Sequence, residues 1–102
     1  MSDLHTVNKS PFEKNSLDTC LRLSKPGSSI LLYEDAVYAA LTGTAATDKI
    51  TGALADRKVY VLEPDFRARG LKTERLIEGV EMVDYAGFVD LVDACSKVQA
   101  WV

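Results

Sequence analysis

The side chain best suited to chemistry in this sequence is Cys20, within the segment SLDTCLRLSK at residues 16–25. A cysteine is a nucleophile when it ionises, but it is also a small apolar side chain that fills protein cores. Drawn as a helix, the segment places Cys20 in the middle of an apolar arc, whose other members are Phe12, Leu17, Leu21 and Leu23. This position favours the core. A sheltered crevice also suits a cysteine that carries sulfane sulfur, because a bound persulfide must be shielded from stray thiols.

A reactive Cys20 needs a partner that favours its thiolate, such as a nearby cation, a helix N-terminus or a histidine. Arg22 and Lys25 are the nearest cations in the sequence, but neither shares the helical face of Cys20. The single histidine, His5, lies in a predicted strand and could pair with Cys20 only if the fold brings the two together. The sequence therefore leaves both interpretations of Cys20 open.

The second cysteine, Cys95, falls in the apolar stripe of the last predicted helix, which also contains Phe88, Leu91 and Val92. This spacing predicts that Cys95 is a core residue. The chain has two cysteines, far apart, and one histidine, so it shows neither a disulfide framework nor the paired spacing of a zinc site. We therefore predict no structural metal.

Carboxylates follow two of the predicted strands, at the end where open α/β sheets bind ligands. They are Glu34, Asp35, Glu63 and Asp65. They could form a magnesium or phosphate pocket, as in receiver-like domains, or Asp35 and Asp65 could cap the helices that begin there. Capping is the simpler interpretation. The sequence has no GxGxxG, GxxxxGK(S/T) or GxSxG pattern, so no cofactor is predicted.

The segments that position these residues alternate between strand and helix. Strands are predicted at 4–7, 28–34, 58–64 and 80–84, with VQAWV at 98–102 as a closing edge strand. Helices are predicted from about 11 to 24, at 35–43, for a turn or two at 50–54, at 65–70 and at 85–97. The first of these is expected to start at a capping box, formed by Ser10 and Glu13 around Pro11. This order predicts a small three-layer α/β domain over residues 1–102, with a mostly parallel sheet flanked by helices.

Composition and charge narrow the function classes. The 102 residues are 47% hydrophobic and carry a formal net charge of −3. An acidic chain without a basic face repels phosphate, so direct binding to nucleic acid is not expected. The apolar runs are too short to span a membrane and residues 1–9 do not resemble a secretory signal, which predicts a cytoplasmic protein. The apolar share is generous for so small a body, so we expect partner subunits to cover part of the surface.

The amino-acid sequence resembles the DsrH/TusB family of sulfur-relay subunits. The resemblance spans nearly the whole length and is carried by residues 4–41, 59–71 and 83–101. Its most specific motifs are the opening HTxxxSP, DxxARGL at 65–71, VDYxxFV at 83–89 and the closing AW. The resemblance implies a DsrE-like fold, and a heterohexamer with DsrE/TusD-like and DsrF/TusC-like subunits.

Such complexes receive sulfane sulfur as cysteine persulfide and pass it to a DsrC/TusE-type carrier, so the resemblance implies a sulfurtransferase relay. Cys20 matches a cysteine in the first helix of DsrH-type subunits, which favours the DsrEFH branch of sulfur oxidation. The alternatives are a TusB-like subunit for tRNA 2-thiouridine synthesis and a non-catalytic assembly subunit. The principal acceptor cysteine of these complexes belongs to the DsrE/TusD partner, so Cys20 is expected to carry sulfur only in a secondary step, if at all.

Overall fold

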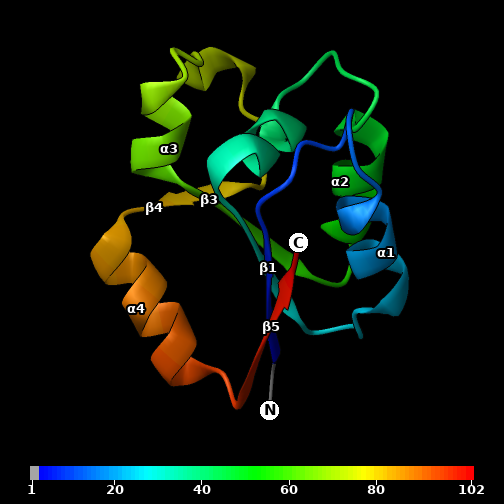
Figure 1. The fold of residues 1–102 in the computed structure, drawn as a ribbon, viewed down its shortest axis with the longest axis vertical. Coiled ribbons are helices and arrows are strands. Elements are labelled where there is room, and N and C mark those ends of the chain that lie inside the picture. The colour runs from blue at the N-terminus through cyan, green and yellow to red at the C-terminus, as the bar shows by residue number, and fades with distance from the viewer. Residues whose placement is uncertain (1–2) are drawn as a thin grey trace.

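The computed structural model describes residues 3–102, and within them one five-stranded sheet organises the fold (Figure 1). Its strands are β1 (Asp3–Val7), β2 (Ser29–Leu32), β3 (Lys58–Leu62), β4 (Glu81–Val83) and β5 (Lys97–Trp101). They lie in the order β4-β3-β2-β1-β5, and every pairing in this described sheet is parallel. The predicted parallel α/β sheet is confirmed, and the closing segment forms the edge strand β5 beside β1.

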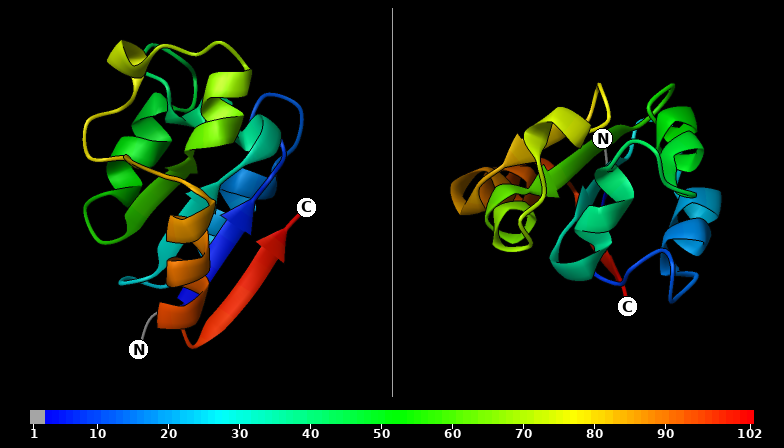
Figure 2. Two further views of the ribbon diagram at one scale, coloured as in Figure 1. Left: turned by 90° about the vertical axis from the view of Figure 1, so that its left-hand side faces the viewer. Right: turned by 90° about the horizontal axis from the view of Figure 1, so that it is seen from above.

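Helices cover both faces of the sheet and give the predicted three layers. The α-helices are α1 (Ser16–Leu23), α2 (Thr47–Ala53), α3 (Glu63–Ala68) and α4 (Tyr85–Ala94), with 3-10 helices η1 (Glu34–Ala40) and η2 (Thr73–Arg75). Figures 1 and 2 show α1 and α2 on one side of the sheet and α4 on the other, with η1 beyond the end at which β2 finishes. Across residues 3–102, no helix has the length and apolar character that a membrane crossing requires.

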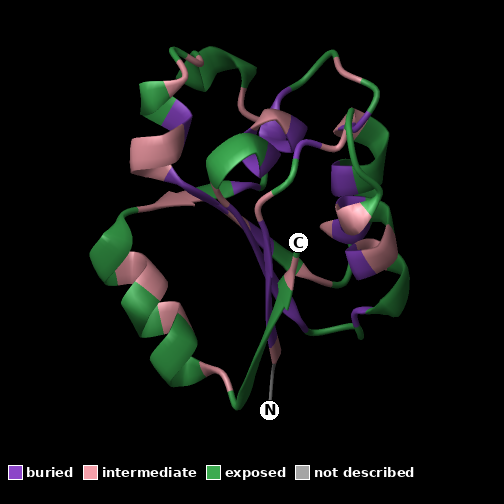
Figure 3. Ribbon diagram, in the orientation of Figure 1, coloured by how far each residue is buried: buried purple, intermediate pink, exposed green. Residues whose placement is uncertain are grey.

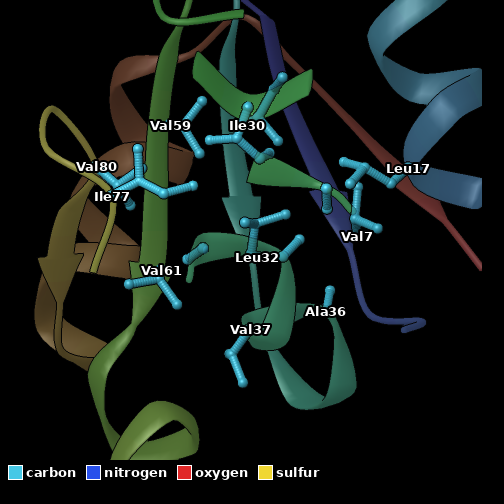
Figure 4. Packing of buried hydrophobic residues seen from close by; sticks show 14 of the residues in the cluster. Val7, Leu17, Ile30, Leu32, Ala36, Val37, Val59, Val61, Ile77 and Val80 are labelled. Carbon is cyan, nitrogen blue, oxygen red and sulfur yellow. The ribbon is translucent and has the colours of Figure 1, made fainter. Parts of the chain in front are cut away.

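The core lies between the sheet and the layer of α1 and α2. All four residues of β2 are buried, as expected of a central strand with both faces covered. Figure 4 shows its side chains Ile30 and Leu32 among those of the neighbouring strands and η1. Leu17 on α1 and Ile50 on α2 close the same cluster from the helix side. Burial of these apolar side chains is the main force that holds the helices on the sheet.

The first helix is shorter than predicted, because the Ser10 segment forms a turn. The Ser10 carbonyl accepts hydrogen bonds from the backbone N–H groups of Glu13 and Lys14, and its hydroxyl accepts one from Phe12. These bonds satisfy the local donors that a capping box would have satisfied. Helix α1 then begins at Ser16, and the Phe12 side chain is 55% exposed rather than part of the apolar arc. The predicted capping box was wrong.

The last helix also differs from its prediction. Helix α4 ends at Ala94, so Cys95 lies just past its end and is half-buried rather than a core residue. No residue of α4, which the structure describes in full, is buried (Figure 3). Its apolar residues form two stripes, and only one of them can face the sheet. The stripe of Tyr85, Val89 and Val92 stays exposed, although the spacing had placed Val92 in the same stripe as Cys95.

Candidate functional site

Cys20 lies on the inner face of α1, fully buried in the core cluster beside Leu17. Burial raises the pKa of the Cys20 thiol to about 12, and the positive charge of Arg57 opposes this rise only in part. A buried thiol with this pKa is neutral near pH 7 and out of reach of another protein's thiol. The arrangement thus supports the core interpretation in this structure. A reaction of Cys20 with another protein's thiol would require this packing to change.

Arg57 is the cation whose charge lowers the pKa of Cys20, and the sequence analysis did not identify it. It sits in the turn between α2 and β3, with its side chain 15% exposed. One guanidinium nitrogen, Nη1, donates to the Leu21 carbonyl at 2.6 Å and to the Ser24 hydroxyl at 2.8 Å. The predicted candidates Arg22 and Lys25 are exposed instead. Arg57 lies 37 residues after Cys20 in the sequence, and no local pattern relates the two.

His5 is paired with Trp101, not with Cys20. The Trp101 indole donates from Nε1 to Nδ1 of His5 at 3.0 Å, and the two rings are stacked with centroids 6.2 Å apart. Burial is the main cause of the lowered pKa of His5. The negative charge of Asp3 raises this pKa, and the positive charges of Lys97 and Arg57 lower it. This neutral imidazole fastens the edge strand β5 to β1. The possible Cys–His pair is therefore not formed in this structure.

The carboxylates of Asp35 and Asp65 join two helices: η1, which follows β2, and α3, which follows β3. The Asp65 carboxylate accepts the backbone N–H of Glu34 at 2.7 Å, and Arg69 bonds the Asp35 carboxylate at 3.0 Å. The N-cap residues of η1 and α3 are Tyr33 and Leu62, and neither makes a side-chain cap, so the prediction that Asp35 and Asp65 cap the helices that begin there was wrong. Within residues 3–102, Glu34 is the one non-glycine residue at positive φ, 49°, and its backbone N–H is the group that donates to Asp65. No group of three metal-ligating side chains occurs among the described residues.

Cys95 lies on the opposite face of the sheet from Cys20. Cys95 directly follows α4, and α4 lies on the other side of the sheet from α1 (Figures 1 and 2). Cys20 belongs instead to the cluster under α1. The two sulfurs are thus separated by the sheet, and they cannot act together in one step within a single copy of the chain.

Comparison with known proteins identifies the family. The family described as "DsrH like protein" matches residues 9–98. "Protein TusB" of Pectobacterium parmentieri is 37% identical over 98 residues, which cover 96% of this chain and 99% of that protein. "Protein TusB" of Shigella flexneri is 36% identical over the same share of each chain. The crystal structure of ychN protein from E. coli superposes with a TM-score of 0.82 at 25% identity, and covers 98% of this chain and 99% of that one. The chain therefore belongs to the DsrH/TusB family of sulfur-relay subunits.

Proposed function

We propose that this protein is a subunit of a cytoplasmic sulfur-transfer complex. In this complex it assembles with DsrE/TusD-like and DsrF/TusC-like subunits as a heterohexamer, and the complex delivers persulfide sulfur to a DsrC/TusE-type carrier. The family match over residues 9–98 carries the proposal. The full-length similarity to TusB proteins and the shared fold support it.

Within the complex, we propose that Cys20 is the group on this chain that holds sulfur. Its thiolate would attack the terminal sulfur of a donor persulfide, form a new S–S bond and release the donor as a thiolate. The terminal sulfur moves with its proton, so the step needs no outside oxidant or reductant. The step requires an exposed and ionised Cys20, whereas in this structure, here called the closed form, Cys20 is buried and neutral. Sulfur loading is therefore restricted to a form in which α1 has opened.

Mass analysis of each subunit after treatment of the complex with a persulfide donor tests this step. We expect one added sulfur on the wild-type chain and none on Cys20→Ala, because the new S–S bond forms at that atom. Cys95→Ala is the matched control and should load normally, since Cys95 lies across the sheet. An unloaded wild-type chain, or equal loading of Cys20→Ala, would refute a sulfur-carrying role for Cys20.

A non-catalytic assembly role is the second candidate, and the burial of Cys20 favours it. Here the chain completes the complex, and the partner subunit's cysteine performs the transfer. Sulfur flux through the complex distinguishes the two roles. Flux that stays normal in Cys20→Ala supports assembly alone.

The branch of metabolism is a separate part of the proposal. Cys20 favours the DsrEFH-type branch of sulfur oxidation, because DsrH-type subunits carry a cysteine in this helix. The TusB names of the relatives favour tRNA 2-thiouridine synthesis. Genes for dissimilatory sulfite reductase beside the gene for this chain would argue for the first branch and against the second.

Helix α4 is the surface we propose for a partner subunit. Tyr85, Val89 and Val92 form an apolar stripe with exposed fractions of 58%, 56% and 37%. Asp90 and Asp93 are exposed on the same helix, which has no basic residue in its last turn. A partner of the same fold would need an apolar patch with a basic border to match this surface.

Val89→Lys tests this surface. We expect subunit binding to weaken by about 2 kcal/mol or more, because the interface would bury an unpaired charge. Phe12→Lys is the control, since Phe12 is 55% exposed in the turn before α1, away from α4. Binding constants of the purified chain for its partners give the answer. Equal loss in both variants, or in neither, would rule out α4 as the specific contact.

A further inference from the structure

Cys20 lies on the face of α1 that packs on the sheet. The contacts that hold α1 on the sheet therefore limit access to its sulfur. The helix has eight residues, of which Leu17 and Cys20 are buried. A helix of this length is not stable without packing. Residues 12–15 before it and 25–27 after it are exposed, so neither flanking segment packs its side chains into the core.

Apart from the buried Leu17, the N-terminal half of α1 has only weak polar contacts with the rest of the fold. The described hydrogen bonds include no side-chain cap at Asn15. The Asp18–Lys49 ion pair, at 2.8 Å, joins side chains that are 53% and 48% exposed. Exposed ion pairs of this kind contribute little to stability because water and salt screen them.

The C-terminal end of α1 is held differently. Arg57 donates to the Leu21 carbonyl and to the Ser24 hydroxyl, and the Ser24 backbone N–H in turn bonds the Cys20 carbonyl at 2.8 Å. The Arg57 side chain is 15% exposed, so these charge-assisted bonds are largely shielded from water. Its Nε also bonds the Asp56 carboxylate at 3.0 Å, which fixes the guanidinium in place. The backbone of the same turn accepts the Gly27 N–H at 2.7 Å.

We propose that Arg57 is a positioning residue that clamps the C-terminal end of α1 and thereby sets how often Cys20 becomes accessible. The guanidinium satisfies a carbonyl at the helix end that would otherwise lack a partner. Opening of α1 breaks both of its bonds to the helix, so the clamp adds directly to the free energy of opening. The charge of Arg57 lowers the pKa of Cys20, which agrees with a guanidinium at the C-terminal end of α1. The inference rests on the proposed role of Cys20, because a sulfur that never reacts needs no clamp.

The test measures how fast Cys20 is alkylated by iodoacetamide at pH 8 under native conditions, over a series of low urea concentrations. The chain carries Cys95→Ala so that one thiol is followed. We expect Arg57→Gln to raise the rate about tenfold or more, because it removes bonds to a charged group. The urea dependence should stay shallow, as for local opening, and not match that of global unfolding.

Arg67→Gln is the matched control. Arg67 is 59% exposed and its guanidinium bonds the Glu63 carboxylate on α3, far from this contact, so the rate should not change. Ser24→Ala removes one acceptor of the clamp and should give a smaller increase; it also decides the matter if Arg57→Gln does not fold. The clamp is refuted if neither variant accelerates alkylation beyond its loss of global stability.

The alkylation assay contains no persulfide, so it fails or succeeds independently of sulfur transfer. Faster alkylation in Arg57→Gln together with an unloaded Cys20 in the complex would keep the clamp and remove the sulfur-carrying role. Unchanged alkylation with a loaded Cys20 would do the reverse.

Discussion

Phe66→Ala should cost about 3–5 kcal/mol of stability, the range for removal of a large buried aromatic side chain. Phe66 is the largest of the fully buried side chains in residues 3–102 and belongs to the main core cluster. Of the described residues of α3, it alone is buried, so it is the anchor of that helix. Its loss leaves a cavity and also loosens α3, from which Asp65 and Arg69 reach η1.

Urea unfolding followed by circular dichroism measures this loss. Phe12→Ala removes the same atoms from a side chain that is 55% exposed, and should change stability by about 0.5 kcal/mol or less. A small, equal effect in both variants would show that α3 is not packed on the core as the structure has it.

Alkylation of Cys20 in the folded, isolated chain should be about a thousandfold slower at pH 8 than in the urea-unfolded chain. The reason is ionisation: burial raises the pKa of this thiol from 9.0 to about 12, so about a thousandfold less thiolate is present at pH 8. The measurement is a pair of alkylation rates in the Cys95→Ala background.

The pH dependence of the alkylation rate is a second test of the burial of Cys20. The raised pKa favours the neutral thiol in the closed form, so the closed form is most stable below pH 9 and loses stability as pH rises toward 12. The alkylation rate of the folded chain should therefore keep rising by about tenfold per pH unit above pH 9, where the unfolded chain levels off. A rate that levels off at the same pH in both states would contradict the sealed position of Cys20.

Local patterns predicted the sheet well. The mainly apolar segments at 28–34 and 58–64 become β2 and β3, because central strands of a parallel sheet have most of their side chains covered by helices. Gly70, at φ 67°, ends the α3 segment where the glycine indicated a stop. The family was also recognisable from its motifs, since these extend over nearly the whole chain.

The contacts around Cys20 could not be predicted, because they join residues that are distant in sequence. Arg57 meets α1 only after β2 and α2 have brought the chain back beside it. Trp101 reaches His5 only because β5 pairs with β1, across 96 positions. The apolar arc of the first helix was misleading for Phe12 and Leu23 for a related reason. Periodicity shows which side chains share a face, but packing decides whether that face is covered.

The open sheet leaves two unpaired edges, and each is built in a way that resists fibrous growth. On one edge, β4 has three residues, too few to template a long ladder. On the other, β5 begins with the exposed, charged Lys97, which discourages a further strand from aligning beside it. Association through backbone ladders is disfavoured at both ends of the sheet. Copies of this chain therefore resist edge-to-edge association even though α4 exposes an apolar stripe.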